Sequence, residues 1–511
     1  MNTKPFWLVL IASVFVCSRA QAQGELQAAY HEQYRPQIHF SPKEKWTNDP
    51  NGMVYYKGVY HLFFQYYPGG IVWGPMHWGH AESTDLIHWK QLPIALYPDS
   101  LGYIFSGSAV VDQNNTSGLA SGGAIPLVAV FTHHNPVLQK QGSHVYQNES
   151  LAYSLDEGST WVKYAQNPVL KNPGITDFRD PKVRWYAPAK RWIMTLATKS
   201  FITFYSSPDL KSWRRESAFG SDLGGHGGVW ECPDLFPLKL AGSTYWVLIV
   251  NVNPGAPNGG SGTQYFIGNF DGANFTPLDR ATRWLDYGPD EYAGITWSNT
   301  GNRSIFLGWM SNWSYANQVP TKVWRNAMTV PRDLFLKKVD GKLLVSSDPV
   351  PELKLVWKDS VVRSDVQIGG GIDLAGKVRD SGGRYLIKFS TRRLSDYSLT
   401  LSNAAGNVVI LGYDHTRNTY YIDRSGSGDV KFSPKFAGRF YAPRLTSSPA
   451  HDMILVIDDS SIELFADGGL SVMTCIFFPV QPLNKVNMRS REPLLLDKLS
   501  TTSLNSIWQI P

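Results

Sequence analysis

A short pattern that recurs along the first two thirds of the chain constrains the fold more than any other feature. The pattern is Ser-x-Asp-x-x-x-Trp; copies begin at Ser83, at Ser154 (one residue longer) and at Ser207, and a degenerate copy occupies 271–275. Each copy follows a short aromatic or β-branched run, such as residues 201–205, which is typical of a strand. Repeats of about 50–70 residues built from short strands are typical of β-propeller blades. The alternative is chance recurrence in a Trp-rich β protein.

The rest of the chain has a different pattern. The repeat disappears after about residue 345, and Pro-Val-Pro at 349–351 marks a junction. Alternating strands such as residues 397–401 and 461–465 follow, separated by Gly-containing turns, and this favours a β-sandwich. No long stretch has a helical period. We therefore expect an all-β protein with a propeller over residues 32–345 and a sandwich over residues 355–511.

The first 22 residues resemble a secretory signal. Lys4 precedes an apolar run at 6–17, and Ala-Gln-Ala at 20–22 fits a small-x-small cleavage site. A membrane anchor is the alternative, but the apolar run is short for a span. We expect an exported protein, periplasmic or extracellular, with no membrane span.

Charge and cysteine content exclude several classes of protein. Loss of Lys4 and Arg19 lowers the formal net charge from +6 to +4, and without a basic block this predicts no nucleic-acid partner. Cys232 and Cys475 remain in different predicted domains, so we expect two free buried thiols. No Cys/His cluster has zinc spacing, and we expect no metal site.

Three motifs, far apart in the chain, each place one carboxyl group in an aromatic, turn-forming setting. They are Trp-Thr-Asn-Asp-Pro-Asn-Gly at 46–52, Phe-Arg-Asp-Pro at 178–181 and Trp-Glu-Cys-Pro-Asp at 230–234. Two opposed carboxyl groups are the minimum equipment for cleaving a glycosidic bond, because one must be ionised while the other holds a proton for the leaving group. The 67 aromatic residues (18 Trp, 25 Tyr and 24 Phe) suit the C–H faces of sugar rings, although most of them are expected in the core.

Each motif also has a structural explanation. Asp-Pro and Asn-Gly at 49–52 are strong turn signals, and Glu231 could be an ordinary buried carboxyl group. Arg179 and Asp180 could form a plain ion pair. Because adjacent strand residues point to opposite faces, a bend before Pro181 is needed if both are to reach one ligand. The apolar residues beside Glu231 favour a carboxyl group that keeps its proton, as a general acid must.

Together these residues resemble glycoside hydrolase family 32, the β-fructosidases, from about Arg35 to the C-terminus. The ordered set that carries the resemblance is 46–52, Phe-Phe-Gln-Tyr at 63–66, Phe-Ser-Gly-Ser at 105–108, 178–180 and 231–234. The resemblance implies a five-bladed β-propeller followed by a β-sandwich, retaining hydrolysis and no cofactor. Within this family the segment at 308–313 is more similar to levanases and exo-inulinases than to plant invertases.

The resemblance also implies roles for individual residues. Asp49 matches the nucleophile, Glu231 the acid/base and Asp180 the transition-state stabiliser. The positions that match fructose-binding residues are Trp46, Asn48, Gln65, Trp73, Phe105, Ser106, Arg179 and Trp309.

The function expected from this resemblance is removal of terminal non-reducing β-D-fructofuranosyl units from a fructan such as levan or inulin, from fructo-oligosaccharides and from sucrose. So many groups around one fructosyl unit favour a closed-ended pocket and exo cleavage. The alternatives are an endo-levanase, a dedicated invertase and, from another class, a non-catalytic fructan-binding protein. The presence of all three carboxyl groups argues against the last.

Overall fold

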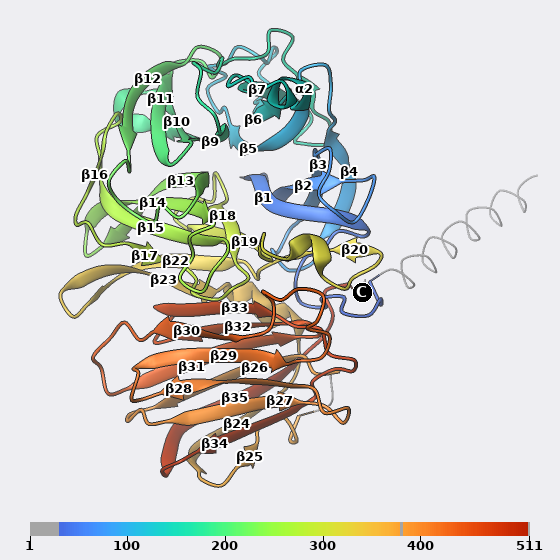
Figure 1. The fold of residues 1–511 in the computed structure, drawn as a ribbon. Coiled ribbons are helices and arrows are strands. Elements are labelled where there is room, and N and C mark those ends of the chain that lie inside the picture. The colour runs from blue at the N-terminus through green and yellow to red at the C-terminus, as the bar shows by residue number, and fades with distance from the viewer. Residues whose placement is uncertain (1–29, 379–381, 509–511) are drawn as a thin grey trace, which may run out of the picture.

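A computed structural model describes residues 30–378 and 382–508, so the predicted signal at 1–22 lies outside the described residues. Five small sheets are arranged around an axis as a propeller, and two larger sheets stack beside them as a sandwich (Figure 1). The predicted all-β fold, a five-bladed propeller followed by a β-sandwich, is confirmed. No helix among the described residues is long and apolar enough to cross a membrane.

Each blade is an antiparallel sheet whose first strand lies nearest the axis. Blade 1 contains β1 (Lys45–Tyr56), β2 (Val59–Tyr67), β3 (His77–Ser83) and β4 (Lys90–Leu96), with β20 (Trp324–Arg325) paired to β1 in parallel. Blade 2 contains β5 (Tyr103–Val111), β6 (Leu127–His134), β7 (Gln147–Ser154) and β8 (Val162–Lys163). Blade 3 contains β9 (Phe178–Tyr186), β10 (Arg191–Thr198), β11 (Phe201–Ser207) and β12 (Arg214–Phe219).

Blades 4 and 5 carry extra short strands. Blade 4 contains β13 (Val229–Leu240), β14 (Ser243–Asn253), β15 (Gly262–Phe270), β16 (Phe275–Pro277) and β17 (Arg283–Trp284). Blade 5 contains β18 (Tyr292–Thr296), β19 (Ile305–Met310), β21 (Ala327–Met328), β22 (Arg332–Val339) and β23 (Lys342–Pro349). The helical elements are short: α2 (Pro136–Lys140), η1 (Ala187–Ala189), η2 (Ala316–Gln318) and η3 (Pro351–Val356).

The sandwich consists of two six-stranded sheets. One has the order β24 (Trp357–Ile368), β35 (Leu494–Leu504), β26 (Tyr385–Thr391), β31 (His451–Asp458), β32 (Ser461–Ala466) and β33 (Ser471–Ile476). The other has the order β25 (Ile372–Asp373), β34 (Lys485–Ser490), β27 (Tyr397–Ser402), β28 (Val408–Asp414), β29 (Thr419–Gly426) and β30 (Arg439–Pro443). Alternate residues of both sheets, such as Leu399, Leu411 and Leu455, form the core between them.

The repeated Ser-x-Asp-x-x-x-Trp pattern is the turn between the third and fourth strands of blades 1 to 3. In blade 1 the carboxylate of Asp85 accepts hydrogen bonds from the backbone N–H groups of Ile87 and His88, and the indole of Trp89 donates to the carbonyl of Leu86. The copy at 207–213 in blade 3 forms the same three types of bond. The repeated residues therefore form the same hydrogen-bonded turn in different blades, which excludes chance recurrence.

The first strand of every blade is interrupted at the same place. In each one a β-bulge sets two residues opposite one residue of the second strand: 48–49 in β1, 105–106 in β5, 180–181 in β9, 232–233 in β13 and 293–294 in β18. A bulge bends the strand and turns side chains away from the pleat. The bulge at 180–181 supplies the bend that Arg179 and Asp180 need if both are to reach one ligand.

Buried ionic groups join the propeller to the sandwich. The guanidinium of Arg332 in blade 5 donates to Asp286 at 3.0 Å and to Glu463 of β32 at 3.0 Å. The ring of His39, ahead of blade 1, lies between Asp458 and Glu463, with each ring nitrogen 2.8 Å from a carboxylate oxygen. All five side chains are almost fully buried, so the two parts form one continuous body.

Candidate active site

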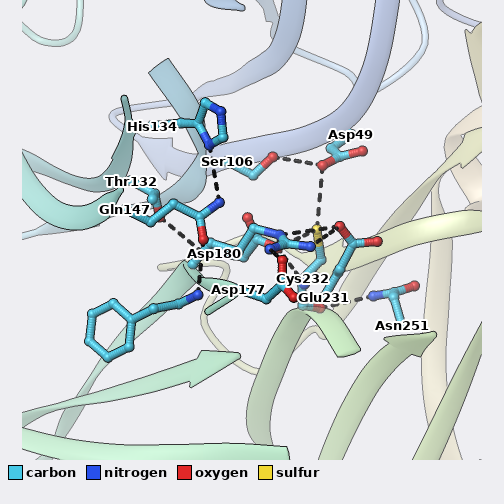
Figure 2. A network of polar contacts seen from close by, with 12 residues as sticks. Asp49, Ser106, Thr132, His134, Gln147, Asp177, Asp180, Glu231, Cys232 and Asn251 are labelled. Carbon is cyan, nitrogen blue, oxygen red and sulfur yellow. Dashed lines mark hydrogen bonds and ion pairs between the residues drawn. The ribbon is translucent and has the colours of Figure 1, made fainter. Parts of the chain in front are cut away.

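A pocket of about 250 Å³ opens at one end of the propeller, where the bulges of the first strands lie. It is lined by Asn48, Asp49, Gln65, Trp73, Phe105, Ser106, His134, Gln139, Tyr146, Gln147, Asp177, Arg179, Asp180, Glu231 and Trp313. The three predicted carboxyl groups, from blades 1, 3 and 4, meet in this pocket. Figure 2 shows Asp49, Asp180 and Glu231 grouped around Cys232.

Both oxygens of Asp49 are held in place. Oδ1 accepts a hydrogen bond from the amide of Asn48 at 2.7 Å, and Oδ2 accepts one from the hydroxyl of Ser106 at 2.7 Å. The indole of Trp46 donates to Oδ1 of Asn48 at 2.8 Å and so orients that amide. Burial raises the pKa of Asp49, and the charge of Glu231 raises it further, whereas the two hydrogen bonds act in the opposite direction.

Asp180 occupies the bulge of β9 with a left-handed backbone (φ 65°). Its Oδ2 accepts a hydrogen bond from the backbone N–H of Cys232 at 3.0 Å, and its own N–H donates to the hydroxyl of Thr132 at 3.0 Å. Burial raises the pKa of Asp180 to about 7, although the neighbouring charge of Arg179 acts against the shift. The conformation, which is uncommon for a non-glycine residue, brings Asp180 to the same pocket as Arg179.

Glu231 has polar surroundings, which corrects the apolar setting expected from its sequence neighbours. Nε and Nη2 of Arg179 donate to its Oε1 at 3.2 and 3.0 Å, and the hydroxyl of Tyr292 donates to its Oε2. Arg179 is held in turn by Asp177, 2.6 Å from Nη1. Because adjacent strand residues face opposite ways, the side chain of Trp230 points instead into the core between blades 3 and 4.

Cys232 places a thiol between two of the carboxyl groups. Its Sγ lies 3.5 Å from Oδ2 of Asp49 and 3.7 Å from Oδ2 of Asp180. Burial and the nearby carboxylates raise the pKa of Cys232 well above its usual range, so the thiol keeps its hydrogen and can donate it. Cys232 and Cys475 are both free and buried, as predicted.

Six of the eight predicted binding residues lie in the pocket wall: Asn48, Gln65, Trp73, Phe105, Ser106 and Arg179. Trp73 stands at the rim with 40% of its surface exposed. Trp46 and Trp309 are fully buried and lie behind the wall, where both pack on Trp313. Trp313, four residues beyond Trp309, reaches the pocket.

Several lining residues were not predicted from the sequence. Phe105 stacks on His134, with ring centres 4.2 Å apart, and Gln147 contacts the same imidazole. Asp177 precedes the motif at 178–181 by one residue, and this proximity was a usable signal. Tyr292 comes from blade 5 and lies far from every motif in the chain, so nothing local indicated that it contacts Glu231.

The arrangement can protonate, attack and stabilise in one small space. Carboxyl groups from separate blades face the pocket together with Arg179. Burial alone would lower the pKa of Arg179, but the surrounding carboxylates raise it, so the guanidinium keeps its charge. Aromatic and amide groups complete the wall. The fold and the paired carboxyl groups of the site are those of a glycoside hydrolase.

Comparison with known proteins identifies the family. The glycosyl hydrolases family 32 N-terminal domain matches residues 39–347, and the family's C-terminal domain matches residues 359–504. The chain is 46% identical over 494 residues to a levanase of Bacillus subtilis, covering 94% of this chain and 71% of that protein. It is 38% identical over 506 residues to an extracellular exo-inulinase of Aspergillus niger, covering 92% of this chain and 94% of that protein.

A solved structure shows the same architecture. The exo-inulinase of Aspergillus awamori superposes with a TM-score of 0.86 at 35% identity, covering 94% of this chain and all of that one. The chain therefore belongs to glycosyl hydrolases family 32.

Proposed function

We propose that this protein removes terminal non-reducing β-D-fructofuranosyl units from levan or inulin, from their oligosaccharides and from sucrose, with retention of configuration. The observation that carries the proposal is the pocket of about 250 Å³ with Asp49, Asp180 and Glu231 in its wall. It lies below the roughly 300–1,000 Å³ of pockets for drug-sized ligands, and therefore suits one sugar ring. The levanase and exo-inulinase relatives support the substrate class.

In the first step Asp49 attacks the anomeric C2 of the fructosyl unit. Glu231 gives its proton to the departing glycosidic oxygen, and the bond from C2 to that oxygen breaks as the bond to Asp49 forms. The hydrogen bonds from Asn48 and Ser106 hold the attacking carboxylate in one orientation, so that little reorganisation is needed. The product of this step is a fructosyl–enzyme ester.

In the second step Glu231 takes a proton from water, and the water oxygen attacks C2 and displaces Asp49, which releases fructose. Both transition states resemble an oxocarbenium ion. In its ionised form, Asp180 stabilises that positive charge, and Arg179 with Asp180 holds the ring hydroxyls. Gln65, which donates to the carbonyl of Ile104 at 3.0 Å, sits rigidly in the pocket wall.

The small pocket supports exo cleavage. Asn48, Ser106 and Asp180, from the bulges of three blades, line a volume that suits a single ring. A pocket for one terminal unit favours release of one fructose in each turnover. The runner-up functions are endo-cleavage of levan and a preference restricted to sucrose.

The deciding experiment is digestion of levan, inulin and sucrose side by side, with early products separated by chromatography. Fructose as almost the only early product from the polymers is the expected result. A ladder of fructo-oligosaccharides with a fast fall in viscosity would contradict exo cleavage. Turnover of sucrose without turnover of either polymer would identify an invertase.

Two further assignments are proposals of the same kind. We propose that residues 1–22 are a secretory signal, so that the protein works in the periplasm or outside the cell; the relative named extracellular supports this. We also propose that residues 32–345 form the catalytic domain and residues 355–511 the sandwich domain. The short η3 at Pro351–Val356 spans the junction and supports that boundary.

A further inference from the structure

A second cavity, of about 770 Å³, opens at the opposite end of the propeller from the pocket. Its wall includes Arg184 near the end of β9, the last part of β13 and the β18–β19 turn at residues 297–304. The same three strands carry Arg179, Glu231 and Tyr292 at their beginnings. Arg184 follows Arg179 by five residues, which at about 3.3 Å per residue corresponds to on the order of 15 Å. The two cavities therefore lie at opposite ends of the propeller.

Arg184 supplies hydrogen-bond donors that the protein does not use. Its Nε donates to the carbonyl of Leu235 at 3.2 Å, and no residue in the described ranges accepts a hydrogen bond from its terminal nitrogens. Burial lowers the pKa of Arg184, and the carboxylate of Asp234 offsets this only in part. A partly buried guanidinium with unused donors at the wall of a cavity is suited to a ligand with acceptor oxygens.

Two other charged groups of the wall, Arg303 and Asp333, are paired with each other. Arg303 donates to Asp333 at 3.0 and 2.8 Å and to Glu352 at 2.6 and 3.1 Å, so its fork is fully occupied. The carboxylates around it leave the cavity with little net charge beyond Arg184 and the exposed Lys239. The donors of Arg184 can serve the acceptor oxygens of a neutral polyhydroxylated ligand as well as those of an anion, and titration with phosphate distinguishes the two.

Polar and apolar groups in the wall match a sugar chain. Asn302 and Thr300 stand on the exposed turn, and Phe335 of β22 has 47% of its surface exposed. An exposed ring beside amide and hydroxyl groups is the combination that binds the C–H face and the hydroxyl groups of a sugar. The volume lies within the roughly 300–1,000 Å³ of ligand sites, enough for more than one ring.

We propose that this cavity is a second carbohydrate-binding site, which holds a neutral fructan chain away from the catalytic pocket. The identity of the sugar rests on the proposed function. Because the two cavities lie at opposite ends of the propeller, one short oligosaccharide cannot occupy both. The site therefore acts only on polymers, by keeping the enzyme attached to a branched or aggregated fructan between cleavage events.

The test combines Phe335→Ala with Asn302→Ala and, separately, Arg184→Gln. Leu278→Ala is the matched control, because Leu278 is equally exposed (46%) and does not line the cavity. We expect KM for levan or inulin to rise about five- to tenfold in the cavity variants, with kcat/KM for sucrose within twofold of the wild type. An unchanged KM for both polymers, or an equal loss on sucrose, overturns the proposal.

Binding is measured independently of turnover in the Asp49→Ala background, by the retardation of the protein in gels that contain levan or inulin. The cavity substitutions should reduce the retardation at least threefold, and Leu278→Ala should not. Titration with inorganic phosphate tests whether the cavity binds an anion instead of a sugar. If phosphate binds to the wild type but not to Arg184→Gln, while retardation in the gels is unchanged by the cavity substitutions, the cavity is an anion site and the proposal is overturned.

Failure of the proposed function is distinguishable from failure of this site. If the wild type released no fructose while retardation still depended on Phe335, the second site would stand without the activity. Melting temperatures of all variants identify folding defects. If Arg184→Gln does not fold, the exposed pair Phe335→Ala and Asn302→Ala decides the outcome alone.

Discussion

The guanidinium of Arg179 donates two hydrogen bonds to a single oxygen of Glu231, from Nε at 3.2 Å and from Nη2 at 3.0 Å. The planar fork fixes the direction of the carboxyl group, and only the other oxygen, Oε2, is left to Tyr292. A lysine at this position would keep the charge but could not supply two donors in one plane.

Arg179→Lys should therefore lower kcat on sucrose about 10²-fold, within the range seen when a positioned donor is removed from a charged transition state. Steady-state kinetics on sucrose measure the loss. Lys163→Ala is a control for loss of a cation outside the pocket, since Lys163 bonds to Asp99 on the outer part of blade 2. A kcat for Arg179→Lys within threefold of the wild type would show that Arg179 is not needed for catalysis.

Asp49 and Glu231 should respond differently to the leaving group. Asp49→Ala is expected to abolish turnover of every substrate, because no covalent bond to the fructosyl unit can form. Glu231→Ala should lose about 10³-fold on sucrose but far less on an aryl fructoside, whose leaving group needs no proton. Equal losses of Glu231→Ala on both substrates would contradict its role as the acid.

The hydroxyl of Ser106 should set the acidic limb of the pH profile. Activity needs ionised Asp49, so it falls as the pH drops through the pKa of that carboxyl group. The hydrogen bond from Ser106 lowers the pKa of Asp49, and its loss in Ser106→Ala should move the acidic limb of kcat/KM upward by about one pH unit. Ser108→Ala is the matched control, since the hydroxyl of Ser108 donates to the carbonyl of Pro181 and contacts no carboxylate. A downward shift in Ser106→Ala would refute this assignment.

His39 should make stability fall in alkaline solution. Burial alone would lower the pKa of His39, but its hydrogen bonds to Asp458 and Glu463 outweigh that effect and raise the pKa to about 9. The unfolded value is about 6.5, so the stabilisation is fully present below pH 6.5 and is lost as the pH rises to 9. The difference corresponds to about 3 kcal/mol. Urea unfolding at pH 6 and pH 9.5 should show this loss in the wild type, and a smaller one in His39→Gln. Equal pH slopes in the two proteins would contradict it.

The sequence was sufficient for the fold and for groups that are adjacent in the chain. The turn at 83–89 forms the same hydrogen bonds as the corresponding turn in blade 3, and Pro181 indicates the bulge at Asp180. Residues close in the chain therefore determine both features. Contacts between blades could not be predicted from the sequence. Tyr292 meets Glu231 only because blades 4 and 5 are neighbours around the axis, and no local pattern encodes that approach.

Strand boundaries explain why Trp309 lies behind the pocket wall and Trp313 reaches it. Trp309 pairs with Tyr292 inside blade 5 and is buried, whereas Trp313 lies past the end of β19 and is free to turn into the pocket. Which of two nearby indoles faces a cavity depends on where a strand stops, and that boundary is poorly determined by a single sequence. The same reasoning applies to Glu231, whose neighbours in the chain are not its neighbours in space.

The five aligned bulges allow side chains at the pocket end of the propeller to vary while the pairing of the strands stays the same. The two residues of each bulge lie outside the regular pairing of their sheet, so their side chains can change without altering strand register. Phe105, Asp180, Cys232 and Ala293 are the first bulge residues of four successive blades, yet they are an aromatic ring, an acid, a thiol and a methyl group. A propeller of this kind can therefore change the chemistry of its pocket by single substitutions at such positions while its blades stay the same.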